Sequence, residues 1–126
     1  MRSIINTSKA PAPIGSYNQA VLVKETLYIS GQIAIDPETN ELKTSSLEEE
    51  TALVMRNLSA ILNEADMTFE NVVKSSIFIS NMKNFAIINK IYSKCFREEN
   101  APARETVEVA NLPKYVNVEI SMIAVR

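Results

Sequence analysis

The C-terminal segment Ala101–Arg126, APARETVEVANLPKYVNVEISMIAVR, decides the fold of this chain. Apolar residues alternate with polar ones over Thr106–Ala110 and again over Val116–Val125, which is the period of a β-strand. Leu112–Tyr115 separates the two stretches and contains a proline, which is typical of a turn. The segment therefore predicts two strands joined by a turn.

The second of these strands has one apolar face and one polar face, because strand side chains alternate between the two faces of a sheet. The apolar face comprises Val116, Val118, Ile120, Met122 and Ala124. The polar face comprises Asn117, Glu119 and Ser121. A carboxylate in mid-strand suits a wet cavity or an interface, and Arg104 stands in the loop just before the first strand. We hypothesise that Arg104 and Glu119 meet at one small-molecule site.

Length and composition are those of a single domain that spans residues 1–126. A chain of this length buries about two-thirds of its unfolded surface, which is enough for one core. Hydrophobic residues make up 46% of the chain and charged residues 22%, an ordinary globular mixture. The net charge is −2 and the thirteen Lys and Arg residues are scattered, which argues against a nucleic-acid-binding surface.

Several residue types that carry common chemistries are absent or scarce. The chain has no histidine, which excludes Ser-His-Asp and Cys-His catalysis, His-based zinc sites and the two-histidine nuclease mechanism. With one cysteine and two glycines, the chain builds no intrachain disulfide, Cys cluster or phosphate-binding loop. The N-terminus lacks the apolar core of a signal peptide, and no apolar run is long enough to span a membrane. We therefore expect a soluble, cytoplasmic protein.

The N-terminal part of the chain contains three predicted strands, which are Ser3–Asn6, Gln19–Val23 and Leu27–Ser30. A loop over Lys9–Gly15, stiffened by two prolines, separates the first strand from the second. The second and third strands are joined by Lys24–Thr26, which predicts a hairpin.

Two helices are predicted after a turn cluster at Asp36–Asn40. Ser46 opens the first helix, with Glu49 three residues later as in a capping box, and an apolar face continues to about residue 65. Asn84 is the predicted cap of the second helix, and the polar run Arg97–Asn100 marks its end. The apolar stripe of the second helix comprises Phe85, Ile88, Ile91, Tyr92, Cys95 and Phe96.

A strand over Asn71–Ser80 is predicted between the two helices. Its first face comprises Val73, Ser75, Ile77 and Ile79, and its second comprises Val72, Ser76 and Phe78. The order β-β-β-α-β-α-β-β predicts an α+β fold, with both helices packed on one face of a mixed sheet. The other sheet face, which carries Thr106, Asn117 and Glu119, mixes polar and apolar groups, so we expect oligomerisation through it.

The two charged candidates each have a functional and a purely structural interpretation. Arg104 is either a guanidinium that grips a carboxylate through two parallel hydrogen bonds, or a surface arginine paired with Glu105 or Glu108. Glu119 is either a functional carboxylate or an edge-strand charge that discourages aggregation.

Each uncharged candidate likewise has a functional and a purely structural interpretation. Tyr17 is an aromatic anchor or a lid over the core. Gly31 either lets backbone approach a ligand closely or forms a strand-end turn. Asn89 falls between the apolar positions of its helix and is a ligand contact or a solvated side chain. Cys95 belongs to the apolar stripe, which favours a core role over a nucleophilic one.

Four separated motifs resemble the RidA (YjgF-like) family of 2-iminoacid deaminases. They are Ala12–Ala20 (APIGSYNQA), Ser30–Pro37 (SGQIAIDP), Pro102–Ala110 (PARETVEVA), and Leu112–Lys114 (LPK) followed by Val118–Ile120 (VEI). The motifs run in register along nearly the whole chain without a large insertion. The resemblance implies a chorismate-mutase-like α+β fold and a homotrimer whose sheets form a barrel, with three sites in clefts between subunits.

The same resemblance implies an activity. Members hydrolyse reactive enamine and imine acids, such as 2-aminoacrylate and 2-iminobutanoate, to 2-keto acids and ammonia, and use no metal or cofactor. Arg104 matches the arginine that grips the substrate carboxylate, and Glu119 matches the acid that positions the attacking water. The implied substrate-binding set comprises Arg104, Tyr17, Ser30, Gly31, Asn89 and Thr106.

The chain departs from the family pattern at four positions. Ser16 replaces a usual proline, Asn18 a usual serine, and Asn111 a common arginine. Thr106 stands where many members carry cysteine, and its hydroxyl retains the capacity to hydrogen-bond. These changes bear on loop stiffness and substrate range and leave the arginine–glutamate pair intact.

Two other functions stay open. The first is an endoribonuclease or translation inhibitor, against which the acidic pI, the missing histidines and the scattered basic residues all count. The second is a non-catalytic ligand-binding or chaperone-like trimer, for which Arg104 would suffice and Glu119 would be surplus. Deamination fits the residue inventory because an iminium carbon is already electrophilic, so the site needs only to orient the substrate and one water.

Overall fold

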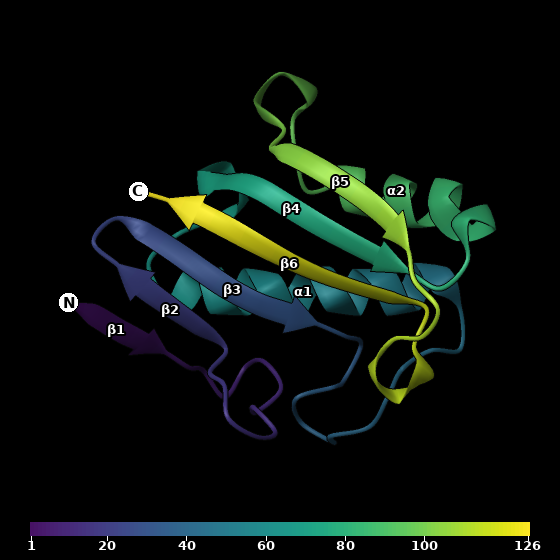
Figure 1. The fold of residues 1–126 in the computed structure, drawn as a ribbon, viewed down its shortest axis with the longest axis horizontal. Coiled ribbons are helices and arrows are strands. Elements are labelled where there is room, and N and C mark those ends of the chain that lie inside the picture. The colour runs from purple at the N-terminus through teal and green to yellow at the C-terminus, as the bar shows by residue number, and fades with distance from the viewer.

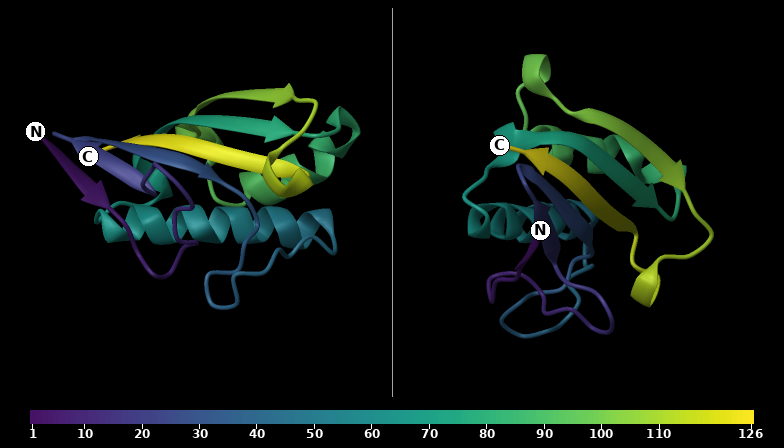
Figure 2. Two further views of the ribbon diagram at one scale, coloured as in Figure 1. Left: turned by 60° about the horizontal axis from the view of Figure 1, so that its bottom comes forward. Right: turned by 60° about the vertical axis from the view of Figure 1, so that its left-hand side comes forward.

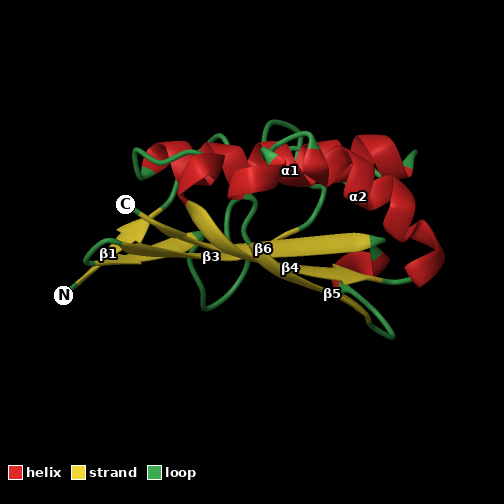
Figure 3. Ribbon diagram, turned by 90° about the horizontal axis from the view of Figure 1, so that it is seen from above, coloured by secondary structure: helices red, strands yellow, loops and turns green.

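The computed structural model describes residues 1–126, and its elements follow the predicted order. One mixed six-stranded sheet has the strand order β1-β2-β3-β6-β4-β5, and both helices cover the same face of it (Figure 1, Figure 3). The strands are β1 (Arg2–Ile5), β2 (Ala20–Val23), β3 (Thr26–Gln32), β4 (Val72–Ile79), β5 (Ala103–Glu108) and β6 (Val118–Val125). The helices are α1 (Leu47–Glu64) and α2 (Phe85–Ser93). The predicted α+β layer is confirmed.

The hairpin between β2 and β3 is also confirmed. Val23 pairs with Thr26, which leaves Lys24 and Glu25 as the turn. Lys24 has a φ of 53°, because the tight turns that match strand twist require a left-handed residue. β3 then continues to Gln32, past its predicted end, and pairs antiparallel with β6.

β6 lies inside the sheet, between β3 and β4. From Val118 onward its burial alternates as predicted, with Val118, Ile120, Met122 and Ala124 buried toward the helices. The strand begins two residues later than predicted, and the prediction of Asn117 on the open face is wrong, because its side chain donates to Glu50 of α1. Glu119 is on the opposite face of this internal strand. Its interpretation as a charge that protects a sheet edge is therefore wrong.

β4 departs from its predicted pattern at its start. The register with β6 shifts between Val72 and Lys74, so Val73 is an extra residue in a β-bulge. Val72 is buried and Val73 is 49% exposed, which reverses the faces predicted for them. Beyond the bulge the pattern is as predicted, with Ser75, Ile77 and Ile79 buried.

β5 runs parallel to β4 and includes Arg104, which is therefore in a strand and not in a loop. Arg104 aligns with Ser75, and Thr106 aligns with Ile77. Aligned residues of neighbouring strands point to the same face, and Ser75 and Ile77 are buried under the helices. Arg104 and Thr106 thus face the helix layer, and the prediction of Thr106 on the open face is wrong.

The N-terminal cap of α1 is partly as predicted. Ser46 Oγ accepts a hydrogen bond from the N–H of Glu49 at 3.1 Å. The Glu49 carboxylate does not accept a hydrogen bond from the backbone N–H of Ser46, as a complete capping box requires. It accepts one from Ser45 Oγ at 2.7 Å instead. The capping box is therefore half formed, because the neighbouring hydroxyl supplies the better donor.

α2 differs more from prediction. Asn84 precedes the helix, but its side chain makes no capping bond. Asn81 Oδ1 instead accepts from the N–H of Lys83 at 2.9 Å and begins a short 3-10 turn that leads into α2. The helix ends at Ser93, before the predicted polar run, and tighter turns follow it.

The main core lies between the sheet and the helices. It includes Leu58, Ile61 and Leu62 of α1, Ile77 and Ile79 of β4, and Ile120 and Met122 of β6. A smaller apolar cluster comprises Ile33, Ile35, Leu112 and Val116, with Phe78 packed against it. None of the helices combines the length and the apolar character needed to cross a bilayer.

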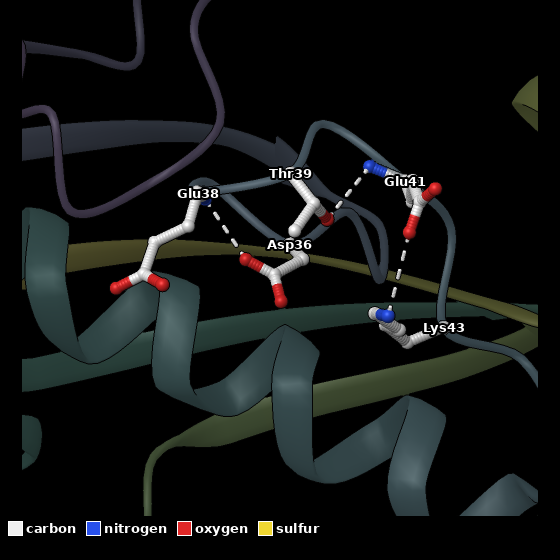
Figure 4. A network of polar contacts seen from close by, with 5 residues as sticks. All are labelled: Asp36, Glu38, Thr39, Glu41 and Lys43. Carbon is white, nitrogen blue, oxygen red and sulfur yellow. Dashed lines mark hydrogen bonds and ion pairs between the residues drawn. The ribbon is translucent and has the colours of Figure 1, made fainter.

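The loop after β3 is held by polar turn contacts, as its composition predicted (Figure 4). Asp36 Oδ1 accepts from the N–H of Glu38 at 2.8 Å, and Thr39 Oγ1 accepts from the N–H of Glu41 at 3.3 Å. Lys43 Nζ lies 3.6 Å from Glu41 Oε1. Figure 2 shows this loop beside α1, below the helix in the left-hand view.

Candidate active site

A cleft of about 510 Å³, which we call the Glu119 cleft, brings together residues from three parts of the chain. The loop before β2 contributes Tyr17, β3 contributes Ser30 and Gly31, and the turn before β6 contributes Lys114. The structure thus gathers four of the predicted site residues, counting Glu119 itself, around one carboxylate. Lys114 is a lining residue that the sequence analysis did not single out.

Glu119 occupies the space that a side chain at Gly31 would need. A Cβ built on Gly31 would lie 2.7 Å from Glu119 Oε2 and 2.9 Å from Cδ. Gly31 therefore serves the close approach of the carboxylate to the β3 backbone. Burial raises the pKa of the Glu119 carboxyl, because loss of water disfavours the charged form. A carboxylate in this state is a better proton acceptor than an exposed one.

The loop that carries Tyr17 is tied down by a buried glutamine. Gln19 Nε2 donates to the backbone oxygens of Thr7, Ala10 and Pro11 at 3.0, 3.2 and 2.8 Å. Gln19 is 2% exposed, so these bonds form away from competing water. The loop is thereby fixed over the cleft, and Tyr17 is half-exposed at its rim rather than a lid over the core.

The hydroxyl and the backbone N–H of Ser30 both form hydrogen bonds within the chain. Its Oγ donates to the backbone oxygen of Asn18 at 2.6 Å, and its N–H donates to the oxygen of Gln19 at 2.9 Å. Ser30 therefore joins β3 to the loop that carries Tyr17. Asn18, one of the departures from the family pattern, also accepts from Asn6 Nδ2 at 3.1 Å through its side chain.

Arg104 lies in a second cleft, of about 570 Å³, which we call the Arg104 cleft. One guanidinium nitrogen donates to Asn89 Oδ1 at 2.6 Å. The guanidinium carbon lies 5.2 Å from the ring centre of Tyr92 and 5.6 Å from that of Phe85, within the range of cation–π attraction. These contacts orient the guanidinium and leave its remaining N–H donors for an anion.

Arg104 has no acidic partner in its own chain. Glu105 pairs instead with Lys74, at 2.8 Å, and Glu108 accepts from the N–H of Met82 at 2.7 Å. The interpretation of Arg104 as a surface arginine paired with a neighbouring glutamate is therefore wrong.

The aromatic contacts of Arg104 were missed in the sequence. Phe85, Asn89 and Tyr92 follow one another at helical spacing, four and three residues apart, and so share one face of α2. Tyr92 Oη also donates to Ser75 Oγ at 2.9 Å, and burial raises its pKa. That spacing was the available signal, but it also matched an ordinary core stripe.

The two clefts lie on opposite sides of the sheet. Arg104 faces the helix layer, as its alignment with Ser75 requires, whereas Glu119 aligns with Phe78 and faces the other way. The hypothesis that the two residues meet is therefore wrong within one chain. Within one chain, Arg104 and Glu119 line two separate clefts.

Thr106 and Cys95 complete the set of candidates. Thr106 Oγ1 is buried without a hydrogen-bond partner, so the hydroxyl's predicted bond is not made within the chain. Cys95 packs beside the core, and burial raises the pKa of its thiol. The core interpretation of Cys95 is confirmed, because a nucleophilic thiol needs a lowered pKa.

A Gly31→Ala variant tests the contact between Glu119 and β3. The added methyl group would overlap the carboxylate, which must swing away because it is the movable end of a side chain. We expect a crystal structure of the variant to show the carboxylate displaced from β3, while the melting temperature changes little. A carboxylate that keeps its wild-type position would contradict the close contact with Gly31.

Comparison with known proteins agrees with this architecture. The family model described as Endoribonuclease L-PSP matches residues 7–126. A RutC family protein of Synechocystis is 48% identical over 97% of this chain and 95% of its own length. The 2-iminobutanoate/2-iminopropanoate deaminase of Rattus norvegicus is 44% identical over 100% of this chain and 91% of its own.

Solved structures give the same result. A Rid-family protein from Yersinia pestis superposes with a TM-score of 0.96 at 43% identity and covers 100% of both chains. TdcF of E. coli, solved with bound serine, has a TM-score of 0.92 at 38% identity and covers 98% of both chains. These matches extend over all or nearly all of the chain, and this chain belongs to the RidA (YjgF-like) family.

Proposed function

We propose that this protein is a deaminase that hydrolyses 2-imino acids to 2-keto acids and ammonia. The observation that carries the proposal is a half-buried carboxylate with a raised pKa, Glu119, held against the Gly31 backbone. A binding protein would have little use for such a proton acceptor. The names of the mammalian relatives support the same reaction.

The reaction needs one group that binds the substrate carboxylate and one general base. Arg104 binds the substrate carboxylate with the N–H donors that Asn89 leaves unused. Glu119 accepts a proton from a water molecule as the water oxygen attacks the iminium carbon. The proton held by Glu119 is then transferred to the nitrogen of the carbinolamine, and the C–N bond breaks to release ammonia. The hydroxyl proton passes back to the Glu119 carboxylate as the C–O bond becomes the keto group. An enamine substrate first tautomerises to the imine.

A complete site in this scheme requires two copies of the chain, because each copy holds the Arg104 cleft and the Glu119 cleft on opposite sides of its sheet. We propose the homotrimer that the family resemblance implies, in which the Arg104 cleft of one subunit adjoins the Glu119 cleft of the next. Tyr17, Ser30, Gly31, Asn89 and Thr106 would then surround the substrate. The serine bound to TdcF has the α-carboxylate that such a site would grip.

Sedimentation equilibrium at micromolar concentration tests the assembly. We expect the mass of three chains, because the open sheet face exposes Tyr28, Val73 and Val107, apolar side chains that favour burial. A monomer at that concentration would contradict both the trimer and the shared site.

A coupled assay tests the reaction. A threonine dehydratase acting on threonine releases 2-iminobutanoate, and added protein should speed the appearance of 2-ketobutyrate at a constant dehydratase level. The Arg97→Lys variant, changed in an exposed surface ion pair with Glu70, should act like the wild type. Loss of RNA in a metal-free buffer, with no effect on ketobutyrate, would favour an endoribonuclease instead. No effect in either assay would favour the ligand-binding alternative.

A further inference from the structure

Glu50 is a buried carboxylate that the proposed reaction does not use. It lies in the first turn of α1 and is 0% exposed. The three salt bridges of the chain involve Glu41, Glu70 and Glu105, so no cation lies close to Glu50. Burying a carboxylate is costly unless hydrogen bonds replace its water.

Both oxygens of Glu50 are occupied by one residue, Asn117. Oε2 accepts from the Asn117 backbone N–H at 2.8 Å, and Oε1 accepts from Asn117 Nδ2 at 2.8 Å. The position of Glu50 at the N-terminus of α1 adds the favourable end of the helix dipole. The contact links α1 to a residue 67 positions away in the sequence.

Asn117 is the last residue before β6, two positions before Glu119. Its backbone oxygen accepts from the N–H of Ser80 at 3.1 Å, so it also contacts the end of β4. The Glu119 carboxylate makes no hydrogen bond within the chain, and it is placed by the β6 backbone and by Gly31. The bonds to Glu50 therefore determine where the strand that carries Glu119 begins.

The turn just before Asn117 is strained. Lys114 and Tyr115 have φ values of 54° and 56°, and this left-handed conformation is unfavourable for residues other than glycine. Strain of this kind persists only where the surrounding structure holds it in place. Burial of Val116 and the Glu50–Asn117 bonds hold the downstream end of this turn, which brings Lys114 to the Glu119 cleft.

We propose that Glu50 is a positioning residue, which sets the place of Glu119 in its cleft through Asn117. This inference rests on the proposed deaminase function and extends it to a residue outside both clefts. Glu50 lines neither cleft, and Asn117 occupies both of its carboxylate oxygens, so Glu50 acts through the entry of the chain into β6.

A Glu50→Ala variant of the full chain should lose turnover selectively. We expect kcat on 2-iminobutanoate to fall about 10²-fold, since a displacement of about 1 Å in a reacting group has that effect. KM should change less than about threefold, because Arg104 and its cleft are untouched. Glu50→Gln should recover most of the rate. Its oxygen can accept from the Asn117 N–H, and its amide can donate to Asn117 Oδ1 after that side chain flips.

Asn71→Ala is the matched control, because Asn71 holds the other end of the same strand. Its Nδ2 donates to the oxygen of Val125 at 3.1 Å, and its Oδ1 accepts from the N–H of Thr68 at 2.9 Å. This variant also loses two hydrogen bonds, yet it should keep kcat within about twofold of wild type. An equal fall of kcat in Glu50→Ala and Asn71→Ala, or no fall in either, would overturn the proposal.

Two further measurements keep the test decisive. If Glu50→Ala does not fold, Asn117→Ala replaces it, and an unchanged kcat there would overturn the proposal, whereas a fall of about tenfold would support it. If the wild type has no deaminase activity, the proposed function fails, and crystal structures decide the positioning role separately. A Glu119 carboxylate displaced from Gly31 in the variant supports that role, and an unmoved carboxylate overturns it.

Discussion

Glu119→Gln should lower kcat on 2-iminobutanoate by about 10²–10⁴-fold, the usual contribution of a general base. The amide keeps the shape of the side chain and its place against Gly31, but it cannot accept a proton from water. Carboxylate binding should persist, because Arg104 is unchanged, so KM should move little. Steady-state kinetics on the imine released by a dehydratase would measure both constants.

The pH profile separates a base from a structural carboxylate. Glu119 must be ionised to act, and burial raises its pKa, so the rate of the wild type should fall as the pH drops through a value above the ordinary carboxyl range. The Glu119→Gln variant should have a lower rate at every pH, and that rate should no longer fall as the pH drops. The Glu70→Gln variant removes a carboxylate from an exposed surface pair, and it should keep both the wild-type rate and the fall in rate at acid pH. Wild-type turnover in Glu119→Gln would eliminate the water-positioning role.

Arg104→Lys should weaken catalysis strongly although the charge survives. An ammonium cannot match both carboxylate oxygens as a planar guanidinium does. The loss of one charge-assisted hydrogen bond costs about 1.5–3 kcal/mol, or roughly 10–100-fold in affinity. A shift of the imine carbon by about 1 Å would lower the rate by a further factor of about 10². The fall in kcat/KM on 2-iminobutanoate measures the combined effect.

The fold should survive this substitution. Arg104 is exposed and unpaired with acid in its own chain, and solvated charges contribute little to stability. Arg97→Lys, in the surface pair with Glu70, is the matched control and should keep full activity. Unchanged kcat/KM with an intact melting curve would remove Arg104 from the site, whereas a collapsed melting curve would make its role structural.

Sequence alone determined the local features of this protein. The element order, the alternating faces of β6, the hairpin at Lys24 and the Ser46 cap all follow from patterns within a few residues of each other. Such patterns are set by side-chain periodicity and backbone preference, which act over one or two turns of chain. Arg104 and Glu119 were singled out from such patterns, whereas the full set of seven site residues came from the match to the family motifs; six of the seven line the two clefts.

Tertiary structure decided what depends on register and on contacts between distant elements. The bulge at Val73 reversed two residues at the start of β4, and the parallel alignment of β5 turned Arg104 and Thr106 toward the helices. The separation of Arg104 from Glu119 follows from that alignment. A strand's period is the same in either register, so only the packing of the whole sheet selects one.

The Glu50–Asn117 contact illustrates the same limit. A glutamate in the first turn of a helix is an ordinary helix-dipole residue by sequence, and nothing near it predicts burial. Its burial and its contact with Asn117 arise only because the start of α1 packs against the entry to β6, 67 residues away. Local periodicity determined which residues face the core and which face outward, and long-range packing determined which of them meet.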